Sequence, residues 1–238
     1  MNHEVPHRQA YRAPEGGTVM ATRRPTASQK SNKANVRRAE IVSAATQLFI
    51  EKGYAATSVQ DIAEAVGLLK GSLFYYISGK EDLLYAVLEG MLATSQADIE
   101  KLSALEIAPL DKVRRIAEAH VRYVLANRDQ ATVFFRDFRS LSDERGREIA
   151  AERENYARRF TDVLREAQDD GAACPDIDIR LASGSLLGML NMVHEWYPHA
   201  DERHVNRLAE EIGDLVVASL RCDPSTHQPG HRGRDGRA

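Results

Sequence analysis

The chain has 238 residues, 43% of them hydrophobic and 28% charged, which is enough apolar material for one good core or two small ones. Its longest uncharged apolar stretch, residues 181–193, is well below the roughly 18 residues of a membrane span, which excludes a membrane protein and predicts a soluble one. The net charge of −3 is unevenly distributed. Residues 1–80 hold 11 Lys and Arg against 6 Asp and Glu, whereas residues 81–238 hold 21 against 29. The basic N-terminal part is therefore the candidate for contact with nucleic acid.

The sequence also excludes a secreted protein and a small domain held together by disulfides. The N-terminal sequence MNHEVPHRQAYRAPEGG has no apolar core, so it is not a secretory leader. Cys174 and Cys222 are too few for a disulfide framework and have no CxxC spacing. We expect two unpaired thiols and a cytoplasmic protein.

Residues 1–33 are rich in Pro, Gly, Ser, Thr, Arg and His and show no apolar period, which predicts a disordered basic arm. Such an arm either lies along the DNA backbone or in a minor groove, or only keeps the protein soluble. Both interpretations stay open, and Met20 is an alternative start of the chain.

A first helix is expected from about Asn35 to Lys52, with Ile41, Ala45 and Phe49 on one stripe. After a break at Gly53-Tyr54, residues 57–80 have the pattern of two short helices joined by a tight turn. That pattern is the layout of a helix-turn-helix.

In this segment Val59, Ile62, Ala63 and Val66 recur at helical spacing, and Gly67 supplies the turn. Leu73 and Ile77 would anchor the second helix. Four polar side chains are left pointing outward, where a cation, a hydroxyl and two phenols suit phosphates and base edges. These are Lys70, Ser72, Tyr75 and Tyr76.

Residues 41–84, IVSAATQLFIEKGYAATSVQDIAEAVGLLKGSLFYYISGKEDLL, resemble the DNA-binding domain of the TetR family of bacterial transcriptional regulators. The resemblance implies an all-α fold with a three-helix DNA-binding domain in residues 34–80. A helical ligand-binding and dimerisation domain would follow in 81–222, and a disordered tail in 223–238. The implied DNA contacts are Arg37, Arg38, Thr57, Gln60, Lys70, Gly71, Ser72, Tyr75, Tyr76 and Lys80.

The chain departs from the usual family pattern at two positions. Leu69 stands where most members carry Ser or Thr, so a side-chain N-cap is missing from the second helix. Phe74 stands where most carry Tyr, so a hydroxyl that could reach a phosphate is lost. The sequence GLLKGSL is similar to a sub-group whose members often respond to acyl-CoA thioesters of fatty-acid or sterol breakdown.

Beyond Lys80 the apolar periodicity predicts six helices. The first is a long amphipathic helix reaching about Leu102. The others are expected at about 109–127, 130–140, 142–170, 178–197 and 201–220.

The helix at 178–197 is apolar nearly all round and carries Gly184 and Gly188, which allow a second backbone to approach closely. Together with a stripe on the last helix that includes Leu215, it predicts a homodimer interface. The alternative is that both helices only close the core of the monomer.

An effector site is expected among these helices, where aromatic and flexible apolar residues cluster. Arg136 and Arg139, three apart on one helix, would meet an anionic group, or instead pair with Asp137, Asp143 or Glu144 at the surface. Arg122 and Tyr123 are further polar candidates. The predicted effector residues are Met91, His120, Phe134, Phe135, Arg136, Phe138, Arg139, Tyr156, Phe160, Met189, Asn191, Met192, His194 and Trp196.

Catalytic and metal-binding patterns are missing from the sequence. His194 and His199 are five apart and Pro198 ends the helix between them, so they do not form a zincin motif. We expect no metal, no cofactor and no enzymatic activity. The sequence predicts a repressor released from a palindromic operator by a small hydrophobic effector, either an acyl-CoA or an aromatic acid. An activator, a ligand-independent DNA binder and an enzyme are the remaining alternatives.

Overall fold

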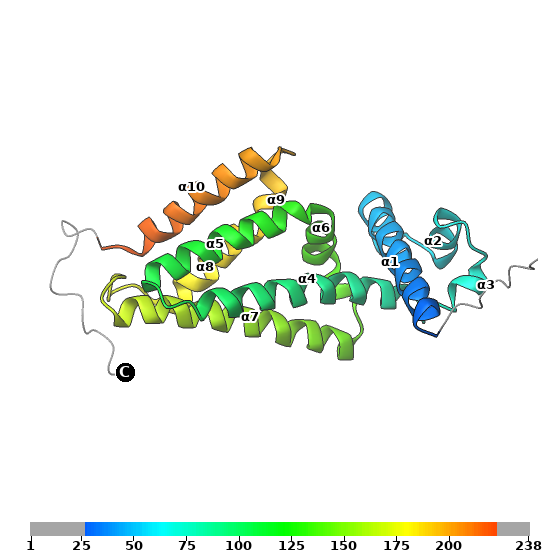
Figure 1. Ribbon diagram of the computed structural model, residues 1–238, viewed down its shortest axis with the longest axis horizontal. Helices are drawn as coiled ribbons and strands as arrows, with labels where there is room; N and C mark the ends of the chain where they lie inside the picture. Colours follow the sequence, from blue (N-terminus) through cyan, green and yellow to red (C-terminus); the bar gives the residue numbers. More distant parts are fainter. Residues whose placement is uncertain (1–26, 223–238) are drawn as a thin grey trace, which may run out of the picture.

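The computed structural model describes residues 27–222 of the chain. A small head of three helices lies at one end of an elongated molecule, and a longer helical bundle makes up the rest (Figure 1). No strand occurs in the described part, in agreement with the predicted all-α fold. The elements are α1 Ala27–Lys52, α2 Val59–Ala65, α3 Lys70–Leu73, α4 Lys80–Ser103, α5 Pro109–Ala126, α6 Arg128–Asp137, the 3-10 turn η1 Phe138–Ser140, α7 Asp143–Asp169, α8 Ile179–Asn191, α9 Val193–Trp196 and α10 Glu202–Leu220.

Helix α1 begins at Ala27 rather than near Asn35, so its first turns lie inside the segment predicted to be disordered. The rest of that basic arm, with Met20, and the predicted tail from residue 223 lie outside the described residues.

The head is held together by a small apolar core. Ile41, Ala45 and Phe49 of α1 are fully buried together with Ile62 and Leu73. At the start of α2 the Ser58 hydroxyl accepts from the Asp61 amide at 3.1 Å, and the Asp61 carboxylate accepts from the Ser58 amide at 2.8 Å. This capping box satisfies two amides that a helix N-terminus leaves free, so it fixes where α2 starts.

Gly67 adopts φ +65°, a left-handed conformation that glycine tolerates best, and turns the chain between α2 and α3. Helix α3 is shorter than the sequence predicts, because the chain passes into a turn after Leu73. The Leu73 carbonyl accepts from the amides of Tyr76 and Ile77 at 2.9 and 3.3 Å. As expected from Leu69, no side chain caps the start of α3.

In the bundle, α4 packs along α7, and α5 contacts α4, α7, α8 and α10 (Figure 1). Gly213 of α10 lies so close to α5 that a Cβ there would come within 2.9 Å of the Glu118 side chain. The missing side chain lets α10 approach α5 closely.

The predicted single helix at 178–197 is in fact two helices. It breaks at Met192, and the Arg128 guanidinium donates to the carbonyls of His194 and Tyr197 at the end of α9. A cation at a helix C-terminus satisfies free carbonyls and stabilises the helix dipole. The N-terminus of α6 is thereby fixed against α9.

The prediction of two unpaired thiols is wrong. Cys174, after α7, and Cys222, after α10, form a disulfide with Cα atoms 4.8 Å apart. The Cys174 amide also donates to the Leu220 carbonyl at 2.8 Å, so the ends of α7 and α10 are adjacent. The two cysteines are 48 residues apart in the sequence, and nothing in their spacing signals this proximity.

Among the described residues no helix is both long enough and apolar enough to cross a membrane.

Candidate nucleic-acid interface and central cavity

The outward side of α3 and the turn after it forms an exposed surface, which we call the reading surface. Tyr75 and Leu69 are each 80% exposed, and Phe74 is 48% exposed. Large side chains of this kind are rarely left in water without a partner. The predicted contacts Lys70, Gly71, Ser72 and Tyr75 are all exposed here, and Tyr76 is partly buried with its ring edge-on to Tyr75.

Three predicted DNA contacts instead have structural roles inside the head. Thr57 is buried, and its hydroxyl donates to the Gly53 carbonyl at 2.8 Å. The Arg37 guanidinium donates to the Val66 carbonyl at 2.6 Å, which ties α1 to the end of α2. The Lys80 ammonium donates to the Tyr54 carbonyl at 2.7 Å and lies 4.3 Å from the centre of the Tyr54 ring.

The remaining two predicted DNA contacts, Arg38 and Gln60, lie at the surface of the head. Arg38 is 3.6 Å from Asp82, and Gln60 donates to Glu64 at 2.7 Å along α2. Glu64 is exposed, whereas Asp82 is partly buried and also pairs with Arg145. Ion pairs and hydrogen bonds of exposed side chains are weak, so Arg38 and Gln60 remain available to a phosphate.

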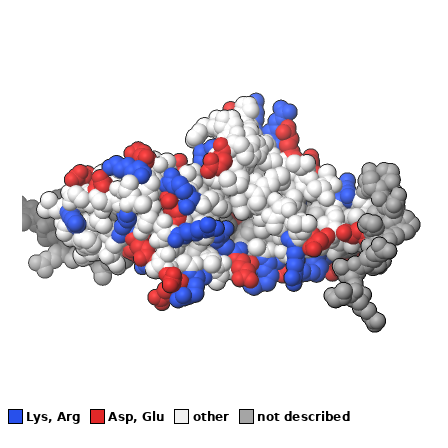
Figure 2. Space-filling view, turned by 180° about the vertical axis from the view of Figure 1, so that it is seen from behind, with Lys and Arg blue, Asp and Glu red and all other residues white. Residues whose placement is uncertain are grey.

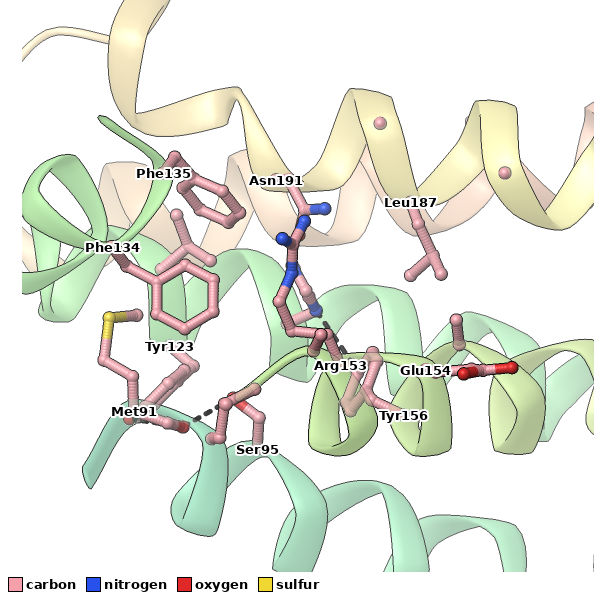
Figure 3. Close-up of a pocket in the computed structure, with 17 residues that line it drawn as sticks. Met91, Ser95, Tyr123, Phe134, Phe135, Arg153, Glu154, Tyr156, Leu187 and Asn191 are labelled. Atoms are coloured by element: carbon pink, nitrogen blue, oxygen red, sulfur yellow. Dashed lines mark hydrogen bonds between the residues drawn. The ribbon is translucent and has the colours of Figure 1, made fainter. Parts of the chain in front are cut away.

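A cavity of about 410 Å³ lies between α4, α5, α6, α7 and α8 (Figure 3). We call it the central cavity, and its volume is within the range of small-molecule sites, about 300–1,000 Å³. The lining residues are Met91, Leu92, Ser95, His120, Tyr123, Val124, Phe134, Phe135, Ala150, Arg153, Glu154, Tyr156, Ala157, Gly184, Leu187, Gly188 and Asn191.

Six of the predicted effector residues line this cavity, namely Met91, His120, Phe134, Phe135, Tyr156 and Asn191. Tyr123, a further polar candidate, also lines it and donates to the Met91 carbonyl at 3.1 Å. Arg122 does not, since its guanidinium bonds Asn206 and Glu118.

Eight predicted effector residues lie outside the lining. Arg136 is exposed and donates to the Phe49 carbonyl of α1 at 2.6 Å and to Asp137 at 2.8 Å. Arg139 is exposed beside the ring of Phe138, and Phe138 itself is a partly buried member of the eight. The remaining five are the core residues Phe160 and His194, the partly buried Met189, and the exposed Met192 and Trp196.

Arg153 is the cation of the cavity lining, and the sequence interpretation missed it. Its guanidinium lies 4.4 Å from the centre of the Phe138 ring and 5.7 Å from that of Phe134, which are cation–π distances. No hydrogen bond or ion pair to Arg153 is present among the described residues, and burial together with the nearby Arg139 lowers its pKa. A partly buried cation without an anionic partner makes the central cavity suited to an anionic ligand group.

A signal for Arg153 was present in the sequence. On α7 the apolar stripe runs Ile149, Tyr156 and Phe160, and Arg153 occupies the position between Ile149 and Tyr156 on the same face. A charged residue within an apolar stripe is unusual. The surrounding run of Arg and Glu concealed it as one more solvated residue.

A chain of polar side chains crosses the cavity wall. His120 Nδ1 lies 2.9 Å from the Tyr156 hydroxyl, and His120 Nε2 lies 3.0 Å from Asn191 Oδ1. Burial lowers the pKa of the His120 ring to about 4, although the bond to Asn191 opposes part of that shift. Burial also raises the pKa of Tyr156. Both groups are therefore neutral near pH 7.

Helix α6 contacts both the cavity and the head. Its Phe134 and Phe135 line the cavity, while its Arg136 bonds the Phe49 carbonyl of α1. At the other end of α6, Asp129 accepts from Gln47 of α1 at 2.6 Å. Helix α6 is therefore joined to α1 of the head near both of its ends.

A second face of the bundle exposes apolar side chains, which we call the apolar face. Leu181 is 70% exposed, Trp196 and Leu215 are each 56% exposed, and Met192 is 44% exposed. They lie on α8, α9 and α10 and, for Met192, at the break between α8 and α9. A broad area without charged side chains is visible over the bundle in the space-filling view (Figure 2). Such a face indicates a protein–protein contact.

Residues 41–87 match the family model described as "Bacterial regulatory proteins, tetR family", and residues 106–220 match "Tetracyclin repressor-like, C-terminal domain". The structure of the TetR-family regulator PfmR from Thermus thermophilus is 32% identical. It covers 76% of this chain and 99% of its own length, with a TM-score of 0.69. The chain belongs to the TetR family of bacterial transcriptional regulators.

Two further relatives of this TetR-family chain are informative. The HTH-type transcriptional repressor KstR2 of Mycolicibacterium smegmatis is 26% identical, over 77% of this chain and 90% of its own length. A structure of AibR in complex with isovaleryl coenzyme A and operator DNA shares the fold, with a TM-score of 0.66 and 23% identity over 77% of this chain and 97% of that one. The family and these relatives are regulators, so the chain is a DNA-binding transcriptional regulator and not an enzyme.

Proposed function

We propose that this TetR-family chain is a repressor that binds a palindromic operator as a homodimer in the cytoplasm and is released by a small hydrophobic effector. The observation that supports ligand control most directly is the position of α6. Its Phe134 and Phe135 line the central cavity, and its Arg136 bonds α1 of the head. A ligand that favours one position of α6 thereby favours one position of the head.

The proposed operator contacts are the exposed residues of the reading surface, Lys70, Gly71, Ser72 and Tyr75, with Tyr76, Arg38 and Gln60 beside them. Two reading surfaces related by a two-fold axis would enter successive major grooves on one side of the DNA. The operator is then a palindrome whose half-site spacing matches the dimer.

The proposed dimer forms through the apolar face on α8, α9 and α10. Leu181 and Trp196 are more than half exposed in the single chain, and neither is needed to close its core. This favours the interface interpretation of these helices over the closed-monomer alternative.

The proposed effector is an acyl-CoA thioester, contacted by Met91, His120, Phe134, Phe135, Tyr156 and Asn191. The apolar walls suit an acyl group, and Arg153 suits an anionic group at its end. A structure of AibR in complex with isovaleryl coenzyme A shares this fold, which supports a ligand of this class. An aromatic acid is the second candidate, favoured by the ring-rich wall of Phe134, Phe135 and Tyr156 beside the same cation.

The experiment is a DNA-binding titration with the upstream region of the gene. The full-length protein should bind one palindromic segment there, and isovaleryl-CoA, octanoyl-CoA or phenylacetate is then added to the complex. We expect release by a CoA ester at concentrations at which free coenzyme A is inactive. Sequence-independent DNA binding would contradict the regulator proposal, and release by phenylacetate alone would favour the aromatic acid.

A further inference from the structure

Tyr156, His120 and Asn191 form a hydrogen-bond chain in the wall of the central cavity. Only one assignment of donors and acceptors along this chain satisfies all of its atoms. Asn191 presents Oδ1, which can only accept, to His120 Nε2 at 3.0 Å. The proton of the neutral ring must therefore be on Nε2. Nδ1 is then an acceptor, and the Tyr156 hydroxyl donates to it across 2.9 Å.

This direction determines what Asn191 offers to a ligand. Its carboxamide oxygen is occupied by His120, and its backbone carbonyl interacts with the His194 ring at 2.9 Å. Its two amide hydrogens have no partner among the described residues, and the side chain projects from α8 into the central cavity (Figure 3). Donors that face a ligand cavity select a ligand that carries an acceptor.

Arg153 and Asn191, two of the polar residues that line the cavity, differ in charge. Arg153 comes from α7 and carries the cation, whereas Asn191 comes from α8 and is a neutral donor (Figure 3). A carboxylate would be attracted to Arg153, but a neutral carbonyl matches the neutral amide of Asn191. A ligand that satisfies both has an uncharged carbonyl next to an apolar chain and a separate anionic group.

We propose that Asn191 recognises the carbonyl oxygen of an acyl thioester, and that the Tyr156–His120 pair is a positioning device that keeps its amide hydrogens turned toward the ligand. The inference rests on the proposed effector class and adds the atom that is recognised. It also predicts that the thioester carbonyl, and not only the length of the acyl chain, determines affinity.

A matched pair of ligands isolates that atom. Octanoyl-CoA and its thioether S-octyl-CoA differ only in the carbonyl oxygen, and both are titrated by calorimetry into the full-length protein. The thioester should bind the parent protein about tenfold more tightly, because the bound thioether covers the Asn191 amide hydrogens without giving them a partner. Asn191→Leu should bind the two ligands equally, because it has lost the donor.

Three further variants separate recognition of the carbonyl from a disturbance of the fold. Met189→Leu, also on α8 but outside the cavity lining, is a volume-conserving change and should keep the tenfold preference. His120→Phe should reduce the preference and His120→Gln should restore part of it, since Gln can still donate to Asn191 Oδ1. A merely structural role for His120 would lower both affinities without changing their ratio.

The ring proton can be observed without any ligand. The chain has 8 histidines, and the His120 signals are identified by their loss in His120→Gln. Nitrogen-15 NMR should show a neutral ring with the proton on Nε2 between pH 6 and 8. A proton on Nδ1 would turn the Asn191 oxygen to the cavity and overturn the proposal.

The other affinities measured by calorimetry also test recognition of the carbonyl. Equal affinity of the parent protein for thioester and thioether, or binding of neither, overturns recognition of the carbonyl. Tighter binding of octanoate than of octanoyl-CoA assigns the site to a carboxylate held by Arg153 and overturns it as well. The regulator function is judged separately by operator binding, which none of these outcomes affects.

Discussion

At the scale of single residues, Arg153 is the feature that most changes the sequence-based view of the ligand site. Arg136 and Arg139 were expected to meet the anionic group, yet both are exposed and outside the cavity lining. Arg153 lines the cavity and has a lowered pKa. The anionic group of a ligand is therefore expected at α7, and not at α6.

We expect Arg153→Ala to weaken effector binding by one to two orders of magnitude, the loss of a charge-assisted contact of about 1.5 to 3 kcal/mol. Arg139→Ala is the matched control and should bind the effector like the parent protein. Both are compared by calorimetric titration with octanoyl-CoA. Equal affinities in the two variants would mean that the Arg153 guanidinium serves only to pack against Phe138.

Tyr75 and Lys80 should behave differently, although both were expected to contact DNA. Tyr75 is 80% exposed, so Tyr75→Ala should abolish specific operator binding while the melting temperature stays nearly constant. Lys80 bonds the Tyr54 carbonyl, so Lys80→Ala should lower the melting temperature. Thermal unfolding and DNA-binding titrations of both variants are the measurements. Full specific affinity in Tyr75→Ala would remove the reading surface from the operator contact.

His120 should make the stability depend on pH. Its pKa is about 4 in the folded protein against an ordinary 6.5, so between these values the unfolded chain binds more protons. Stability therefore falls as the pH is lowered through this range, by about 1 to 3 kcal/mol in total. Urea unfolding at pH 7 and pH 4.5 measures the loss. His120→Gln should lose less over the same interval, and an identical loss would place the titrating group elsewhere.

At the scale of elements, the sequence predicts helix ends well where a local residue determines them. Pro109 begins α5 and Gly171, at φ +78°, follows α7, as the sequence predicts. The break at Met192 was not predictable, because it depends on Arg128, which is distant in sequence, donating to the end of α9. Of the six predicted effector residues that line the cavity, four come from apolar or aromatic patterns, whereas His120 and Asn191 were chosen as polar groups that could orient a ligand. Arg153 was missed because its role depends on which face of α7 is covered.

The apolar face on α8, α9 and α10 gives a prediction about assembly. Leu181→Glu adds a charge to a residue that is 70% exposed, so the monomer should stay folded while the dimer weakens. Ala151→Glu, an exposed position on α7, is the control. Sedimentation at low micromolar concentration should show monomers for Leu181→Glu only, with reduced operator affinity. Dimers in both variants would exclude this face as the interface.

At the scale of the whole molecule, long-range contacts decide features that local patterns cannot show. The Cys174–Cys222 disulfide joins the ends of α7 and α10, and it therefore closes a loop that contains α8, α9, α10 and the four residues of the apolar face. The bonds from α6 to α1 likewise connect residues 82 and 87 positions apart. Such pairings depend on how the helices pack, and a single sequence does not contain them.

The α6–α1 contact leads to the prediction about coupling. Arg136 bonds the Phe49 carbonyl at the end of α1 but lies outside both the cavity lining and the reading surface. We expect Arg136→Ala to bind effector and operator within a few-fold of the parent protein while the two bindings affect each other less. Loss of one contact in such a network reduces coupling by about 0.5 to 2 kcal/mol, or roughly 2- to 30-fold.

The measurement is operator affinity with and without saturating octanoyl-CoA, for the parent protein, Arg136→Ala and Arg139→Ala. The ratio of the two affinities should shrink in Arg136→Ala and stay constant in Arg139→Ala. Because coupling is reciprocal, effector affinity with and without operator must change by the same factor. An unchanged ratio in Arg136→Ala would mean that ligand control reaches the head along another route, through the contacts of Asp82 with Arg145 and of Glu81 with Ser142 at the start of α4.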